Sequence, residues 1–191
     1  LVIFTSDNYI LSSAFGPKDV VPYEIVNKLF QFPSMLLFAA LSPLWSIFAT
    51  AYIAEDRSKL LNVFNKFNRF FILIFISIAL LYLSSPLIIS YWIKNPLDIP
   101  SGLLFITAIA TLLRIFTSFY SFFLYGVGKL NNYILLLLFS ILVKLPLSYW
   151  LISLGYGINS VIITTVMILL VWTIIIPLEC YYLVHKLRKN E

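Results

Sequence analysis

The chain has 191 residues, of which 61% are apolar and 11% are charged, and its mean hydropathy is +0.98. An ordinary soluble domain is about 45–50% apolar and about 25% charged, so this composition excludes a water-soluble enzyme. The net charge of +5 comes largely from short segments between apolar runs, which indicates membrane topology and not a nucleic-acid partner. We therefore expect an all-α, polytopic helical membrane protein in contact with membrane lipids.

Six apolar runs follow one another along the chain. The first, residues 1–15, ends at the turn formers Gly16 and Pro17 and is about 22 Å long as a helix, which is short of a hydrocarbon core of about 30 Å. We expect this first helix to be truncated and the chain to be part of a larger protein. The whole of residues 1–191 is predicted to form a single transmembrane bundle. The other five runs cover residues 20–54, 67–93, 102–125, 133–154 and 159–184.

The second run is too long for one straight crossing. Residues 20–54 would make a helix of about 52 Å, so this run either protrudes from the membrane or bends at Pro33 or Pro43. The segments between runs are short, and none is long enough for a folded active-site lid. They are residues 16–19, 55–66, 94–101, 126–132 and 155–157.

Basic residues are concentrated in alternate segments. By the positive-inside rule, the side richer in Lys and Arg faces the cytoplasm, and the C-terminus lies on that side. Trp92 and Trp150 then fall near the outer interface, where aromatic belts are common. One side has only Lys18 and Lys94, whereas the other has Arg57, Lys59, Lys66, Arg69, Lys129, Lys186, Arg188 and Lys189.

Charged residues also occur inside the apolar runs. A charge at the centre of a bilayer costs about 2.5–3.5 kcal/mol, so each is expected to face protein or water and is a functional candidate. Glu24 and Lys28 are four residues apart and can pair on one helix. Glu179 lies near the inner end, where an interfacial role is expected. The set is Asp7, Glu24, Lys28, Arg114, Lys144 and Glu179.

Arg114 lies at the middle of the fourth run, on a polar stripe. Spacings of three and four residues place Thr107, Thr111, Arg114, Ser118 and Ser121 on one helical face. The stripe predicts a helix that lines a cavity. The alternative is that Arg114 bonds to carboxylates or carbonyls of the bundle and that the hydroxyls only join helices.

Lys144 has a similar but shorter pattern in the fifth run. Ser140 and Ser148 lie four residues to either side of it, and Pro146 opens the local backbone. Two basic residues that face inward at mid-depth would attract an anion such as a phosphate or a pyrophosphate. The pattern therefore favours transport or the handling of anionic lipids.

The sequence contains few of the residue patterns that catalytic sites require. Cys180 is the single cysteine and His185 the single histidine, which leaves no Cys or His cluster for a metal. Paired carboxylates, a Ser-His-Asp set and a glycine-rich phosphate loop are also missing from the sequence. We expect no enzyme activity, no catalytic residues, no metal and no cofactor.

Several short motifs near the start of the chain occur in an order that resembles a known family. This part of the sequence is similar to the second half of bacterial polysaccharide flippases, the exporters of O-antigen and capsule repeat units. That family is related to the multidrug and toxin extrusion transporters and to the lipid II flippase. The motifs are Ser6-Asp7-Asn8-Tyr9-Ile10, Phe15-Gly16-Pro17, Val20, Tyr23, Asn27-Lys28-Leu29-Phe30 and Ser42-Pro43-Leu44-Trp45.

The resemblance implies a fold and a function. Such proteins have about twelve to fourteen spans in two similar halves, so this chain would be the C-terminal half and its partner the missing N-terminal half. The whole protein would flip undecaprenyl-pyrophosphate-linked oligosaccharides across the bacterial plasma (inner) membrane for polysaccharide biosynthesis. In family terms, Lys28, Arg114 and Lys144 would bind the pyrophosphate or acidic sugars, and Asp7 or Glu24 would sense a coupling ion.

Other functions compete with this interpretation. An ion-coupled exporter of drugs or organic ions from the same superfamily would need an acidic cavity for cations, whereas the deepest charges here are basic. A glycan polymerase or acyltransferase would need catalytic carboxylates, His or Arg on a sizeable outer loop. The longest such loop, residues 94–101, has Asp98 as its single residue of these types. A purely structural membrane subunit is the remaining alternative.

Overall fold

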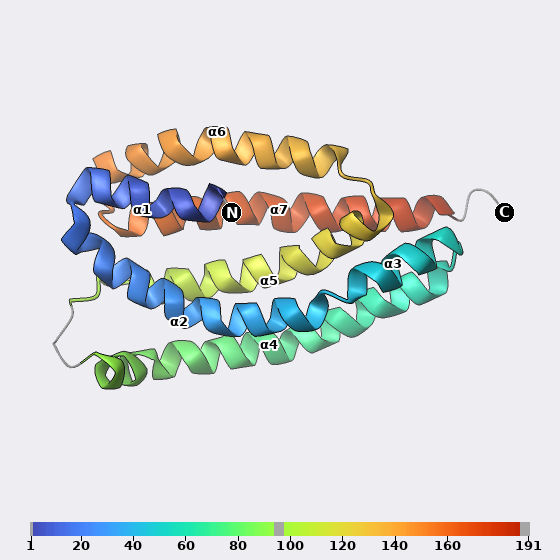
Figure 1. The fold of residues 1–191 in the computed structure, drawn as a ribbon, viewed down its shortest axis with the longest axis horizontal. Coiled ribbons are helices and arrows are strands. Elements are labelled where there is room, and N and C mark those ends of the chain that lie inside the picture. The colour runs from blue at the N-terminus through green and yellow to red at the C-terminus, as the bar shows by residue number, and fades with distance from the viewer. Residues whose placement is uncertain (1, 94–97, 188–191) are drawn as a thin grey trace.

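The chain is all-helical, as predicted. The computed structural model describes residues 2–93 and 98–187, which contain seven α-helices and no strand (Figure 1). Five helical stretches are long and apolar enough to cross a membrane, in agreement with a multi-pass helical membrane protein. The helices are α1 (Val2–Phe15), α2 (Pro17–Leu41), α3 (Leu44–Ile53), α4 (Arg57–Trp92), α5 (Leu103–Val127), α6 (Asn131–Ser153) and α7 (Asn159–Lys186).

The first helix is short. α1 has 14 residues and lies between α2 and α6, which it contacts along with α7 (Figure 1). It ends at Phe15, where Gly16 adopts a φ of 96° and Pro17 starts α2. That backbone conformation favours glycine, and proline suits the first position of a helix because its missing N–H has no partner there. The turn folds α2 back against α1.

The second apolar run is broken at one of the two prolines that were predicted to bend it. α2 continues through Pro33 and ends before Pro43, which caps the start of α3. Ser42 still donates its backbone N–H to the carbonyl oxygen of Phe38 at 2.9 Å, but Pro43 has no N–H to continue the ladder. The bend therefore lies between α2 and α3 (Figure 1).

Helix α4 is longer than the sequence predicted. Residues 55–66 were expected to be a loop, but α4 already begins at Arg57 and has 36 residues. The Asp56 carboxylate accepts a hydrogen bond from the Lys59 backbone N–H at 2.9 Å, which caps the helix and lowers the pKa of this carboxyl. Leu60 and Phe64 are buried on the inner face. Arg57, Lys59 and Lys66 thus belong to an amphipathic helix and not to a loop, whereas Glu55 and Asp56 precede it.

Helix α5 is the central element of the bundle and packs against α2, α3, α4 and α7. An aromatic cluster joins it to α3 and α4. Phe67 stacks on Phe119 with ring centroids 3.6 Å apart, and Phe48 meets Phe64 and Phe123 edge to face at 5.8 and 5.4 Å. These rings fix one side of α5 and leave its other side for α2 and α7.

The described parts of the predicted basic segments lie at one end of the bundle, whereas Arg188 and Lys189, and Lys94 of the other side, lie outside the described residues. The α3–α4 turn, the α5–α6 turn and the last turn of α7 all lie at that end (Figure 1). The Arg57 guanidinium hydrogen-bonds the His185 ring at 2.8 Å and so joins α4 to α7 at this end. The fold thus brings together the segments that the positive-inside rule assigns to one side, whereas their orientation in a membrane stays a prediction.

Gly126 provides a test of the contact between α5 and α3. A Cβ atom at this position would collide with the backbone oxygen of Trp45 and press on Phe48. We expect Gly126→Ala to lower stability by about 1–3 kcal/mol, seen as a lower thermal midpoint in detergent. Gly128→Asn is the control, because Gly128 has open space around it and asparagine tolerates its φ of 71°. An unchanged midpoint for Gly126→Ala would contradict this close packing.

The membrane orientation can be checked with single cysteines. In a Cys180→Ala background, we expect Lys59→Cys and Lys129→Cys to resist a membrane-impermeant maleimide added to intact cells, and Tyr156→Cys to react. The first two positions lie at the basic end of the bundle, and Tyr156 lies in the turn before α7 at the opposite end. Different labelling of Lys59→Cys and Lys129→Cys would show that the span count is wrong.

Candidate functional site

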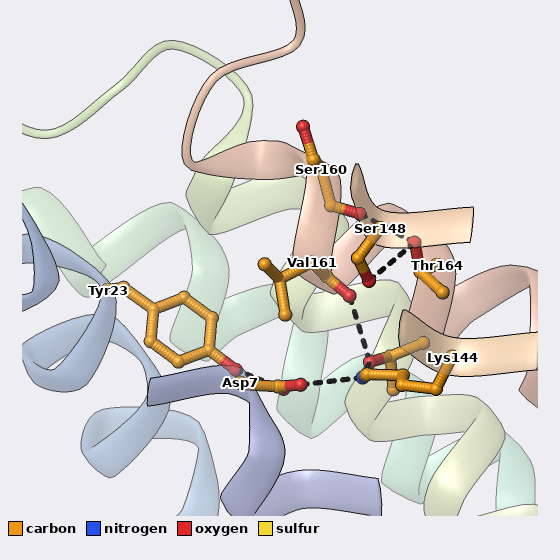
Figure 2. A network of polar contacts seen from close by, with 8 residues as sticks. Asp7, Tyr23, Lys144, Ser148, Ser160, Val161 and Thr164 are labelled. Carbon is orange, nitrogen blue, oxygen red and sulfur yellow. Dashed lines mark hydrogen bonds and ion pairs between the residues drawn. The ribbon is translucent and has the colours of Figure 1, made fainter. Parts of the chain in front are cut away.

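A buried ion pair joins the first helix to the sixth. The Lys144 Nζ atom on α6 lies 2.7 Å from the Asp7 Oδ1 atom on α1, and each side chain is only 2% exposed. The Tyr23 hydroxyl on α2 donates to the other carboxylate oxygen at 2.5 Å. Lys144 also donates to the Thr165 hydroxyl on α7. Four helices, α1, α2, α6 and α7, thus meet at one pair of charges (Figure 2).

Hydroxyl groups surround this pair on the α7 side. The Ser148 hydroxyl on α6 donates to the Thr164 hydroxyl at 3.2 Å, and Thr164 donates to the carbonyl oxygen of Ser160 at 2.9 Å (Figure 2). The Thr165 hydroxyl donates to the carbonyl oxygen of Val161 at 3.0 Å. These bonds satisfy polar groups that would otherwise be buried without partners, and the Ser148–Thr164 bond joins α6 to α7.

The ion pair explains how Lys144 is accommodated inside the bundle. A lone buried charge is costly, but a hydrogen-bonded partner of opposite sign offsets most of that cost. Asp7 supplies the opposite charge, and Tyr23 and Thr165 supply further hydrogen bonds. Lys144 therefore acts within the protein's own polar network.

A separate cavity lies between α2, α5, α6 and α7. It has a volume of about 290 Å³, and Arg114 is the charged residue among the described residues that line it. Arg114 also lies within electrostatic range of Asp7 and Lys144, so with each group in its ordinary ionised form the three carry one net positive charge. The lining residues are Phe38, Arg114, Thr117, Ser118, Ser121, Phe122, Tyr125, Tyr133, Leu137, Ile168, Leu169 and Trp172.

The polar stripe predicted on α5 divides into two parts. Arg114, Ser118 and Ser121 line the cavity. Thr107 and Thr111 are buried, and their hydroxyls donate to carbonyl oxygens one turn earlier on α5, at 2.7 and 2.8 Å. The first part fits the cavity-lining interpretation, and the second satisfies its hydrogen bonds within the helix, as Ser121 also does by donating to the carbonyl oxygen of Thr117 at 2.9 Å.

Aromatic residues form another wall of the cavity. The Tyr125 hydroxyl donates to the Tyr133 hydroxyl at 2.7 Å, and the Tyr133 ring meets the Trp172 ring edge to face at 5.3 Å. The Trp172 indole N–H donates to the Ser140 hydroxyl at 2.8 Å. Sequence reasoning missed this wall, because its residues lie on three helices and share no spacing. Only the aromatic character of each residue was visible in the sequence.

The remaining predicted site residues lie outside the cavity. Lys28 pairs with Glu24 at 3.8 Å on α2, which confirms the pairing expected from their spacing, and the Lys28 side chain is 64% exposed. Glu179 accepts a hydrogen bond from Asn132 at 2.9 Å. Within residues 2–93 and 98–187, no three His, Cys, Asp or Glu side chains gather in a way that could hold a metal ion.

A comparison of the chain with protein-family models, curated proteins and solved structures found no match. The resemblance to polysaccharide flippases stays a prediction. A fold class alone does not determine a function, so the role of the chain is inferred from the residues of the site and their charges.

The ion pair can be tested by a double-mutant cycle. Lys144→Met leaves the Asp7 carboxylate buried without its cation, and Asp7→Asn does the reverse, so each should cost about 3–5 kcal/mol of stability. The double variant should recover much of this loss, because neither charge is then left alone. Thermal unfolding in detergent measures all three variants.

Tyr23→Phe is the control for this cycle. It removes one hydrogen bond to the carboxylate and keeps both charges, so we expect a loss of about 1.5–3 kcal/mol. Losses in the two single variants that simply add in the double variant would contradict a direct interaction between Asp7 and Lys144.

Proposed function

We propose that this chain forms part of a membrane transporter that moves a lipid-linked oligosaccharide and binds its pyrophosphate at Arg114. The observation that carries the proposal is the cavity of about 290 Å³ in which Arg114, at the middle of α5, is the charged lining residue among those described. A cation kept within a membrane bundle is costly, so its place in a cavity favours a role in binding.

The chemistry of the lining suits an anionic glycolipid. A guanidinium presents a planar fork of N–H donors that matches two oxygens of a phosphate group. Ser118 lies one turn and Ser121 two turns after Arg114 on α5, and both line the cavity. Tyr133 and Trp172 offer ring surface, and the Tyr125 and Tyr133 hydroxyls add polar groups. Such mixed surfaces bind amphipathic molecules such as sugars.

The position of the cavity suits loading from the predicted cytoplasmic side. Its lining runs from Arg114 at mid-helix to Tyr125 near the end of α5 and Tyr133 near the start of α6. Those helix ends lie at the basic end of the bundle (Figure 1). A substrate made in the cytoplasm would enter from this end and meet Arg114 at mid-depth.

The three basic residues suggested by the family resemblance are not equivalent in this proposal. Arg114 would bind the pyrophosphate directly. Lys144 would act through its pair with Asp7, which supports the helices around the cavity. Lys28 lies on the surface of α2 beside Glu24. A cation exporter is less well supported, because no Asp or Glu is among the described residues that line the cavity.

Variants at Arg114 test the proposal. In lipid nanodiscs, Arg114→Gln should weaken binding of undecaprenyl pyrophosphate by about tenfold or more, since a hydrogen bond to a charged group contributes about 1.5–3 kcal/mol. Arg114→Lys should keep part of the affinity, because it retains the charge and loses the fork. Native mass spectrometry gives the bound fraction.

The control is Lys66→Gln, which removes an exposed charge from α4. It should leave the affinity unchanged if binding depends on the cavity and not on overall charge. Equal affinities for Arg114→Gln and the unmodified chain, with both proteins folded, would overturn the proposal.

A further inference from the structure

A second hollow lies next to the cavity, in a groove between α6 and α7. Its volume is about 220 Å³, and two of its residues, Ile168 and Trp172, also line the cavity. The Arg114 cavity and this groove are therefore neighbours that share a wall. The groove is lined by Leu136, Phe139, Ser140, Val143, Leu147, Met167, Ile168, Val171 and Trp172.

The groove is suited only to an apolar occupant. Its two polar side-chain groups, the Ser140 hydroxyl and the Trp172 indole N–H, bond to each other at 2.8 Å. The Ser140 hydroxyl also donates to a carbonyl oxygen of its own helix. The other lining side chains are hydrocarbon or thioether. A polar ligand would find no unpaired donor or acceptor there, whereas a hydrocarbon chain would lose nothing on entering.

The groove opens sideways at hydrocarbon depth. Its rim residues Phe139, Met167 and Val171 are 59%, 44% and 42% exposed, whereas Ile168 and Trp172 at its floor are 7% and 8% exposed. The lining residues come from the middle of α6 and of α7. In a membrane, the middle of a spanning helix faces lipid chains and not headgroups.

We propose that this groove holds the hydrocarbon chain of the lipid whose pyrophosphate is bound at Arg114, with Trp172 and Ile168 at the junction between head and chain. This inference rests on the proposed function and adds the path of the lipid chain to it. Its occupant is one long isoprenoid chain attached to an anionic headgroup.

Two features support this occupant. The positive charge of Arg114 in the cavity and the apolar lining of the groove match the two parts of one anionic lipid. The cavity of about 290 Å³ is too small to enclose a long hydrocarbon chain together with its headgroup, so the bundle must let the chain pass sideways into the membrane. The α6–α7 groove supplies such a passage next to the cavity.

Photo-crosslinking with the full chain in phosphatidylcholine nanodiscs tests the path. The probe is an undecaprenyl pyrophosphate analogue with a diazirine in its isoprenoid chain. We expect crosslinks on α6 within residues 136–147 and on α7 within residues 167–171, mapped by mass spectrometry. Excess unlabelled undecaprenyl pyrophosphate should remove them, and undecaprenol, which lacks the anionic head, should not.

Filling the groove gives a second readout. Val143→Trp places a large ring in the groove and should weaken binding of undecaprenyl pyrophosphate by about tenfold, while binding of inorganic pyrophosphate stays unchanged. Leu142→Trp is the matched control, because Leu142 directly precedes Val143 on α6, is 74% exposed and does not line the groove. If Val143→Trp lowers the thermal midpoint, Val171→Trp replaces it as the test variant, because it fills the groove from α7.

The outcomes separate this inference from the proposed function. Two results would overturn the proposed role of the groove: crosslinks elsewhere, or equal lipid binding by Val143→Trp and Leu142→Trp. If Arg114→Gln is still impaired in either case, the proposed pyrophosphate site stays in place. Loss of lipid binding in Arg114→Gln together with groove crosslinks in the unmodified chain supports both. No binding of either pyrophosphate compound by the unmodified chain would overturn both.

Discussion

The ion pair between Asp7 and Lys144 is the interaction on which the arrangement of this bundle depends. Neither charge could be buried alone without a large cost, so α1 and α6 must meet at these two residues. Tyr23 and Thr165 complete the hydrogen bonding and bring α2 and α7 to the same point. The short helix α1 is thereby held against the bundle by one face, from which its carboxylate compensates a cation that belongs to another helix.

Helix α5 divides the bundle into a packed side and an open side. On one side, Phe119 and Phe123 lock into the rings of α3 and α4. On the other side, Arg114 and Ser118 face a cavity that α2, α6 and α7 enclose. The aromatic packing gives α5 a rigid backing, which is what a binding residue at its middle requires. The proposed headgroup site and the proposed chain groove both lie on this open side.

The two acid–base pairs found among the described residues differ in what can be inferred about them from sequence. Glu24 and Lys28 are four residues apart on one helix, so their pairing follows from helical geometry alone. Asp7 and Lys144 are on helices far apart in the chain, and no local pattern relates them. The family resemblance named both lysines as anion ligands, but burial beside a carboxylate distinguishes Lys144 from the exposed Lys28.

The sequence by itself determined the helical class and the apolar runs, and it limited a bend in the second run to Pro33 or Pro43, because hydropathy, helical period and proline chemistry act over a few residues. The structure places the break at Pro43. The sequence also showed that the charge of Arg114 must face protein or water, since lipid would penalise it. Only the tertiary structure decided that Asp7 pairs with Lys144, that α4 begins at Arg57, and that Trp172 separates a charged cavity from an apolar groove. Those outcomes depend on contacts between helices, and packing across the bundle leaves no periodic signal along the chain.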